Sequence, residues 1–116
     1  MKTFSKRSKK PAAQGDLLVR RIKEIPAGAK ETQRVNGRLV VGLSETGHDH
    51  FIHDQRVTML TTSDPLICFL KVEGEYADLV HHREVNPHEG IRLPTGLYEI
   101  RRQREWTPEG WRAVQD

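Results

Sequence analysis

The apolar stretches of this chain are all short, because turn-forming residues separate them. None keeps an apolar stripe with the 3.6-residue period of a helix over about twelve residues. Several instead alternate apolar and polar residues, which is the pattern of a half-buried strand. Turn signals stand at Asn36-Gly37, Glu73-Gly74 and Pro94-Thr95-Gly96. The stretches suited to strands cover residues 16–25, 38–41, 56–62, 66–72, 76–81, 91–93 and 97–104.

Seven or eight short strands with frequent turns predict an all-β fold, a small single-domain barrel or sandwich. The length of 116 residues allows one modest core and not two. We therefore expect a β domain over residues 14–106, preceded by an arm (1–13) and followed by a C-terminal segment (107–116). That last segment is expected to be a tail or a short helix, because Thr107-Pro108-Glu109 is typical of a helix start.

The arm is strongly basic, and its first ten residues contain no acid. Their five cations exceed the net charge of the whole chain, which is +3, so the rest of the chain is slightly acidic. A segment this poor in apolar residues is expected to be disordered by itself. It could bind phosphates or an acidic protein surface in a salt-dependent way, or serve only as a solubilising terminus. The cations are Lys2, Lys6, Arg7, Lys9 and Lys10.

Composition also bears on the compartment. No apolar run approaches the roughly 18 residues of a membrane-spanning helix, so we expect no membrane partner. The basic start MKTFSKRSKK has no apolar segment behind it, unlike a secretory signal. The single cysteine, Cys68, cannot form a disulfide within the chain, which indicates a reducing compartment such as the cytoplasm of a bacterial host. We expect Cys68 to be buried and Phe69 to point to the opposite face of the strand.

Six histidines in the chain fall into two clusters. The first lies in GLSETGHDHFIHD, where strand alternation puts His48 and His50 on one face, with Cα atoms about 7 Å apart. Two such imidazoles can bind zinc, manganese, iron or copper. The alternative is a polar strand start in which Asp49 holds a turn. His53 is three positions beyond His50, and we expect it to be an exposed strand residue.

The second cluster, HHREVNPHEG, contains His81, His82 and His88 and directly precedes the strand that begins at residue 91. If the two clusters meet at one end of the fold, several imidazoles converge on a single point. The alternative is that these are ordinary loop residues. The predicted metal ligands, with an acidic residue of a later strand included, are His48, His50, His82, His88 and Glu99.

Near the C-terminus, arginines and tryptophans alternate with acids. A basic and aromatic patch of this kind suits stacking on single-stranded nucleic acid. The alternative is a solvated strand face, since Glu99, Glu105 and Glu109 interrupt the positive charge. The residues of the patch would be Arg101, Arg102 and Arg104 with Trp106 and Trp111.

The spacing of these motifs resembles that of the cupins. The first cupin motif would run from Gly42 through His48-Asp49-His50 to Asp54, and the second would run from Pro94-Thr95-Gly96 to Glu99 and Gln103. The resemblance implies a metal-binding barrel in which Glu99 takes the place of the histidine of the second motif.

A second resemblance covers nearly the whole β region. It is carried by Gln14-Gly15-Asp16, by the TGHDH motif at residues 46–50 and by the closing stretch LPTGLYEIRRQREW at residues 93–106. These pieces are similar to an uncharacterised family of small bacterial and phage-encoded β proteins. This resemblance implies fold and kinship, and no activity.

Three functions are compatible with these features. The first is a small divalent-metal-binding protein with a binding or regulatory role. The second is a metal-dependent enzyme in which Glu99 or Asp54 would serve as a base. The third is a phage or prophage accessory protein, structural or host-inhibitory, that binds a larger protein or nucleic-acid assembly through its basic arm. A homo-oligomer is compatible with each of them.

Overall fold

The computed structural model describes the backbone of residues 2–3, 12–14, 17–42, 50–81, 90–102, 104–107 and 110–113, and the side chains of 12, 17–42, 50–80 and 90–102. Every regular element in these residues is a strand, which confirms the all-β prediction. No helix that could cross a membrane is found in this part of the chain. The strands are β1 (Lys2–Thr3), β2 (Ala12–Gln14), β3 (Leu17–Ile22), β4 (Lys30–Glu31), β5 (Leu39–Gly42), β6 (His50–Ile52), β7 (Val57–Thr61), β8 (Ile67–His81), β9 (Ile91–Arg102), β10 (Arg104–Thr107) and β11 (Gly110–Ala113).

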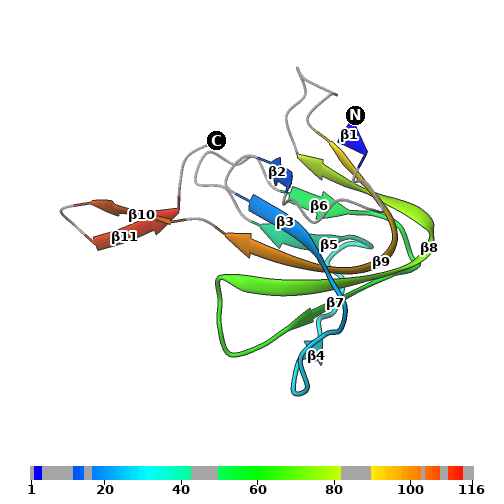
Figure 1. Ribbon diagram of the computed structural model, residues 1–116, viewed down its shortest axis with the longest axis horizontal. Coiled ribbons are helices and arrows are strands. Elements are labelled where there is room, and N and C mark those ends of the chain that lie inside the picture. The colour runs from blue at the N-terminus through cyan, green and yellow to red at the C-terminus, as the bar shows by residue number, and fades with distance from the viewer. Residues whose placement is uncertain are drawn as a thin grey trace.

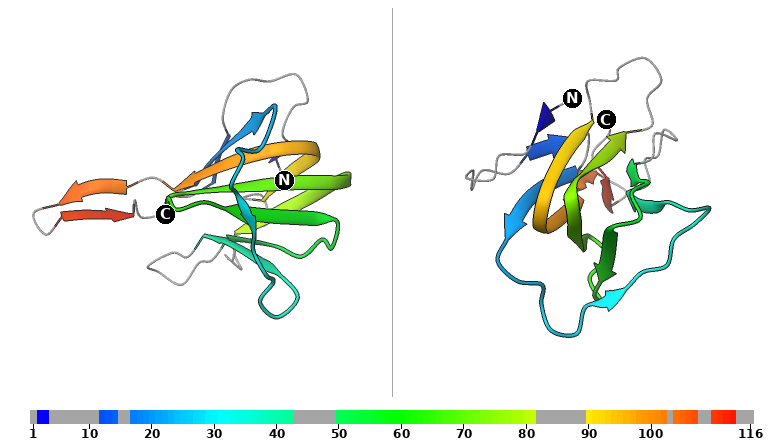
Figure 2. Two further views of the ribbon diagram at one scale, coloured as in Figure 1. Left: turned by 90° about the horizontal axis from the view of Figure 1, so that it is seen from below. Right: turned by 90° about the vertical axis from the view of Figure 1, so that its right-hand side faces the viewer.

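Nine of the strands form one sheet that is open and not a closed barrel. Its path runs from β2 through β3, β9, β8 and β6 to β5. β7 pairs with the first half of β8 and also with β4, and β1 lies parallel to the start of β9. The long strands β8 and β9 bend back on themselves, so the sheet folds over its own core (Figures 1 and 2).

Four of the predicted strands correspond to only two strands in the structure, β8 and β9, each of which bends in the middle. The sequence predicts breaks at Glu73-Gly74 and at Pro94–Gly96, but both strands continue through these residues. Their register shifts between Val72 and Tyr76, so the chain bends there and does not reverse. Gly96 takes a positive φ of 153°, which a side chain would disfavour.

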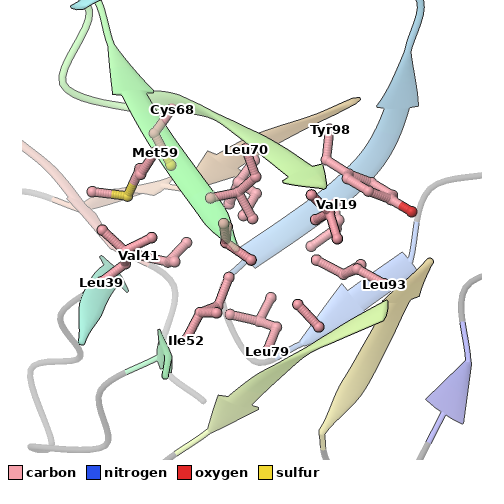
Figure 3. Close-up of a cluster of buried hydrophobic side chains, with 14 of the residues drawn as sticks. Val19, Leu39, Val41, Ile52, Met59, Cys68, Leu70, Leu79, Leu93 and Tyr98 are labelled. Carbon is pink, nitrogen blue, oxygen red and sulfur yellow. The ribbon is translucent and has the colours of Figure 1, made fainter. Parts of the chain in front are cut away.

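The core lies inside the fold of the sheet (Figure 3). In the first half of β8 the inward residues are Cys68, Leu70 and Val72, whereas in the second half they are Ala77 and Leu79. The inward residues thus change from even to odd numbers at the bend. The irregularity at residues 73–75 makes this change possible, so both halves of β8 present apolar side chains to the same core.

The buried state of Cys68 is confirmed. Cys68 is 7% exposed, and burial raises the pKa of its thiol to about 11. Phe69 faces the other side of the strand, yet it is also buried, at 5% exposure. The outer face of this half of the sheet is therefore not simply a solvated surface.

The ends of the chain differ from the predicted boundaries. Ala12 belongs to β2 and packs against the core, and Lys2–Thr3 pair with β9, so parts of the expected arm belong to the sheet. β10 and β11 pair antiparallel as a separate two-stranded sheet, where a tail or short helix was expected from 107 onward. Residues 4–11, most of the expected disordered arm, lie outside the described residues.

The tight turn predicted at Asn36-Gly37 is confirmed. Both residues have positive φ, 53° and 79°, as this kind of turn requires. The flanking Val35 and Arg38 exchange backbone hydrogen bonds of 2.8 Å and 3.1 Å. Local sequence therefore specified this turn without help from the rest of the sheet.

Candidate functional site

His50 is the first residue of β6 and is fully buried, at 0% exposure. Its register partners are Gly42 of β5 on one side and His81 of β8 on the other. A Cβ atom added to Gly42 would lie 3.4 Å from Cδ2 of His50 and 3.1 Å from Cδ2 of Leu17. The imidazole therefore lies on the core side of the sheet, in space that the glycine leaves open.

The pairing of His50 with His81 brings together the ends of two histidine-bearing connections. One connection, residues 43–49, joins β5 to β6 and contains His48. The other, residues 82–90, joins β8 to β9 and contains His82 and His88. These three histidines lie outside the described residues, but the backbone register shows that both connections start from one point on the sheet.

Glu99 does not share the face of His50. Its neighbours Tyr98 and Ile100 belong to the core, so alternation turns Glu99 to the outer face. There its carboxylate accepts two hydrogen bonds of 3.0 Å from Arg20, and Arg101 lies 3.6 Å away. The predicted ligand set is therefore not brought together at Glu99. The part of the chain that the structure describes contains no group of three or more His, Cys, Asp or Glu side chains suited to a metal.

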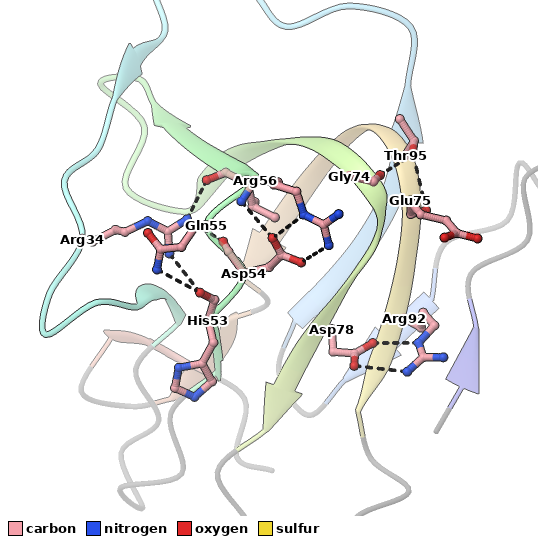
Figure 4. A network of polar contacts seen from close by, with 11 residues as sticks. Arg34, His53, Asp54, Gln55, Arg56, Gly74, Glu75, Asp78, Arg92 and Thr95 are labelled. Carbon is pink, nitrogen blue, oxygen red and sulfur yellow. Dashed lines mark hydrogen bonds and ion pairs between the residues drawn. The ribbon is translucent and has the colours of Figure 1, made fainter.

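The connection between β6 and β7 holds His53 and Asp54 away from the core (Figure 4). Asp54 accepts hydrogen bonds of 3.1 Å and 2.9 Å from the side chain of Arg56 and one of 2.8 Å from its backbone N–H. The hydrogen bonds from the Arg56 side chain and backbone lower the pKa of this carboxyl. His53 is exposed and packs edge-on against Phe51, with ring centroids 4.9 Å apart. Because its pKa is lowered and its oxygens are engaged by Arg56, Asp54 is a weak general base.

A hollow of about 660 Å³ lies between this connection and the second half of β8. Its charged groups are already compensated, because Arg56 pairs with Asp54 and Arg92 pairs with Asp78 at 2.9 Å. Tyr76 at its edge is covered by Arg92, whose Cζ lies 4.0 Å from the ring centroid. The hollow therefore offers shape but no unpaired charge to a ligand. Its lining residues are His53, Asp54, Gln55, Arg56, Tyr76, Ala77, Asp78 and Val80.

The arginines of the expected nucleic-acid patch are not on one face. Arg101 lies outside near Glu99, whereas Arg102 follows Tyr98 and Ile100 onto the inner face. There Nη2 of Arg102 donates a hydrogen bond of 3.1 Å to the carbonyl oxygen of Val41. The side chain of Arg104 lies outside the described residues. Strand alternation alone would have separated Arg101 from Arg102 and drawn attention to the inward one.

The fold and this histidine-bearing end define a class of protein: a small all-β domain whose single open sheet folds over its core. Residues 13–103 match the family described as a domain of unknown function, DUF8820, and the chain belongs to that family. The expected kinship with an uncharacterised family is thereby confirmed. Searches of curated proteins and of solved structures found no similar protein.

Proposed function

We propose that the protein binds a divalent transition metal ion, zinc, manganese or iron, at the His50 end of its sheet, in a binding or regulatory role. The observation that supports this proposal is the register pair of His50 and His81. It anchors two connections that together contain His48, His82 and His88. Imidazole nitrogen suits each of the three metals, and Glu99 has no part in the site.

Chain geometry agrees with this proposal. Directly opposed residues of antiparallel strands have Cα atoms roughly 4.5–5.5 Å apart, which applies to His50 and His81. Consecutive Cα atoms are about 3.8 Å apart, so His82 can be no farther than that from His81. By the same rule His48 can be at most about 7.6 Å from His50. Side chains from both connections can therefore reach a common ion.

The test is a titration of zinc, manganese and iron(II) into tag-free, metal-free protein, followed by calorimetry and by the histidine NMR signals. We expect one equivalent to bind and to shift imidazole signals. His48→Ala combined with His82→Ala should lower the affinity by about 100-fold or more while the core stays intact. Since the metal binds neutral imidazole, affinity should also fall as the pH drops through about 6.5.

The matched control is His53→Ala, because His53 is exposed and packs against Phe51 outside the core. This variant should bind metal as tightly as the unaltered protein. If no imidazole signal shifts at stoichiometric metal, the proposed site does not exist.

In that case the leading function is the phage or prophage accessory protein that binds a larger assembly through its basic arm. Its support is the run of five cations without an acid in residues 1–10. Salt-dependent binding to nucleic acid or to a host complex would be its signature. An enzymatic role has less support, because Asp54 and Glu99 are both held by arginines.

A further inference from the structure

The arginines of the folded sheet differ according to the face that they occupy. On the outer face, Arg20 and Arg101 lie beside the carboxylate of Glu99, at 3.0 Å and 3.6 Å. Also on that face, Arg92 makes a two-pronged contact with Asp78, at 2.9 Å and 3.3 Å. Each of these outer cations therefore lies beside a carboxylate of the protein itself, and Arg20 and Arg101 share that of Glu99.

The inner-face arginines donate to backbone carbonyl groups. Arg21 donates from Nη2 to the carbonyl of Thr95, and Arg102 donates from Nη2 to the carbonyl of Val41. Among the residues described with their side chains, no carboxylate pairs with either of them. A partly buried guanidinium without an anion is costly, because it has lost part of its hydration and gained no opposite charge.

Of the two, only Arg102 is placed to receive a ligand. Nη1 of Arg21 is buried without a hydrogen-bond partner, and its guanidinium packs 5.3 Å from the ring of Tyr98. That atom is closed off by the protein. Arg102 is partly exposed, and its Nη2 uses one hydrogen for Val41. An edge of its guanidinium can still offer two parallel N–H groups, the arrangement that fits a carboxylate or a phosphate.

Arg102 lies at the end of the β8–β9 ladder far from His81, but its side chain reaches across the fold to β5, the strand that pairs with β6 and its His50. The register partner of Arg102 is Leu17, whose Cδ2 lies 3.1 Å from the place that a Cβ of Gly42 would take, and Gly42 pairs with His50. Its hydrogen-bond acceptor, the carbonyl of Val41, belongs to the residue before Gly42. The guanidinium is thus next to the strand pair that carries the buried imidazole.

We propose that Arg102 binds a small oxyanion, a carboxylate or a phosphate group, beside the histidine site. The inference rests on the proposed metal binding for its setting, and it names the class of ligand that the site would take. A metal ion would attract such an anion by its charge. The planar guanidinium would also orient the anion, through two parallel hydrogen bonds.

The experiment uses metal-loaded protein titrated with acetate, as the carboxylate, and with methyl phosphate, as the phosphate ester, at constant ionic strength. The readouts are calorimetry and the Nε–H signals of the arginines. Arg102→Gln should weaken anion binding at least about tenfold, since it removes a charge-assisted hydrogen-bond donor. Arg102→Lys should keep only part of the anion affinity, because lysine has the same charge but cannot donate two parallel hydrogen bonds. Whichever anion binds more tightly to the unaltered protein identifies the group.

The control is Arg101→Gln, which removes the same charge one residue away but on the outer face. It should change anion affinity by less than about threefold, and all three variants should stay folded and keep the metal affinity of the parent. Unchanged anion binding in Arg102→Gln, or an equal loss in Arg101→Gln, would overturn the proposal. So would a loss of metal together with anion in Arg102→Gln. If no variant and no parent binds metal, the proposed function fails, and the same titration of metal-free protein then decides the role of Arg102 separately.

Discussion

A cysteine thiol with a pKa of about 11 stays protonated throughout the neutral range. Burial of Cys68 causes this shift, and the nearby guanidinium of Arg102 opposes it only in part. We predict that a thiol reagent labels Cys68 very slowly in the native protein at pH 8 and rapidly in denaturant, as followed by mass spectrometry. Rapid labelling of native protein would show that this part of the core opens readily.

The same shift makes a prediction about alkaline stability. Because the folded pKa lies above the unfolded one, the native state holds the proton more tightly, so stability is lost as the pH rises from about 9 to about 11. The loss due to Cys68 is limited to roughly 3 kcal/mol. Tyr98, whose pKa is also raised by burial, acts in the same direction.

Urea unfolding of the parent and of Cys68→Ala at pH 8 and pH 11 separates the two contributions. The alanine variant should be less stable at pH 8, since it loses packing, but should lose less stability between the two pH values. An identical loss in both proteins would assign the alkaline effect to other groups.

Gly96 combines two constraints at the bend of β9. Its φ is 153°, and a Cβ there would lie 2.5 Å from Nη2 of Arg21. We predict that Gly96→Ala lowers the free energy of unfolding by about 1–3 kcal/mol, measured by chemical denaturation. Gly28→Ala is the control, because Gly28 also has a positive φ but nothing within 4 Å of the added atom. A loss no larger than in Gly28→Ala would mean that Arg21 adjusts without cost.

At the scale of the element, the bend between the halves of β9 is held by polar contacts with backbone carbonyls. The hydroxyl of Tyr98 donates to the carbonyl of Pro94 at 2.6 Å, and the hydroxyl of Thr95 donates to the carbonyl of Gly74. The first bond is fully buried. These contacts tie β8 and β9 together where their ladder is irregular.

Removal of the Tyr98 hydroxyl should therefore weaken the bend. We predict that Tyr98→Phe destabilises the protein by about 1–3 kcal/mol, because it leaves a buried carbonyl without its donor. Tyr76→Phe is a matched control, since Tyr76 is 40% exposed and belongs to the same bent region. Equal stability of the two variants, measured by urea unfolding, would show that the Tyr98 bond contributes nothing net.

The strand boundaries show what local sequence could predict. Turn residues correctly marked residues 73–74 and 94–96 as places where the chain changes direction. They did not reveal that each strand continues beyond the bend. Whether a chain reverses or only bends depends on the neighbouring strand, and β8 and β9 bend at the same level.

At the scale of the whole molecule, the N-terminal residues contribute unequally. β1 adds only two residues beside β9, whereas Ala12 of β2 packs against the core. Deletion of residues 1–11 should leave the melting temperature almost unchanged, because little apolar surface is lost. Deletion of residues 1–14 should lower it clearly, since β2 and its pairing with β3 are removed. Equal melting temperatures would show that β2 is not part of the stable sheet.

Alternation within each strand determined much of this protein directly. It specified an all-β chain and, within each half of the long strands, a core built from every second residue, while the apolar run around Cys68 predicted its burial. The tight turn at Asn36-Gly37 likewise needed only its own residues. These features depend on neighbours in the sequence, and for that reason a single sequence could predict them.

Only the tertiary structure decided which of the chemical groups meet. The pairing of His50 with His81 joins residues 31 positions apart, and no local pattern specifies such a register. Glu99 was predicted beside the histidines, but the bend places it outside with Arg20 while Arg102 turns inward. Side-chain alternation tells which residues of one strand share a face; which face becomes the interior is decided when distant strands pair and bury their apolar sides together.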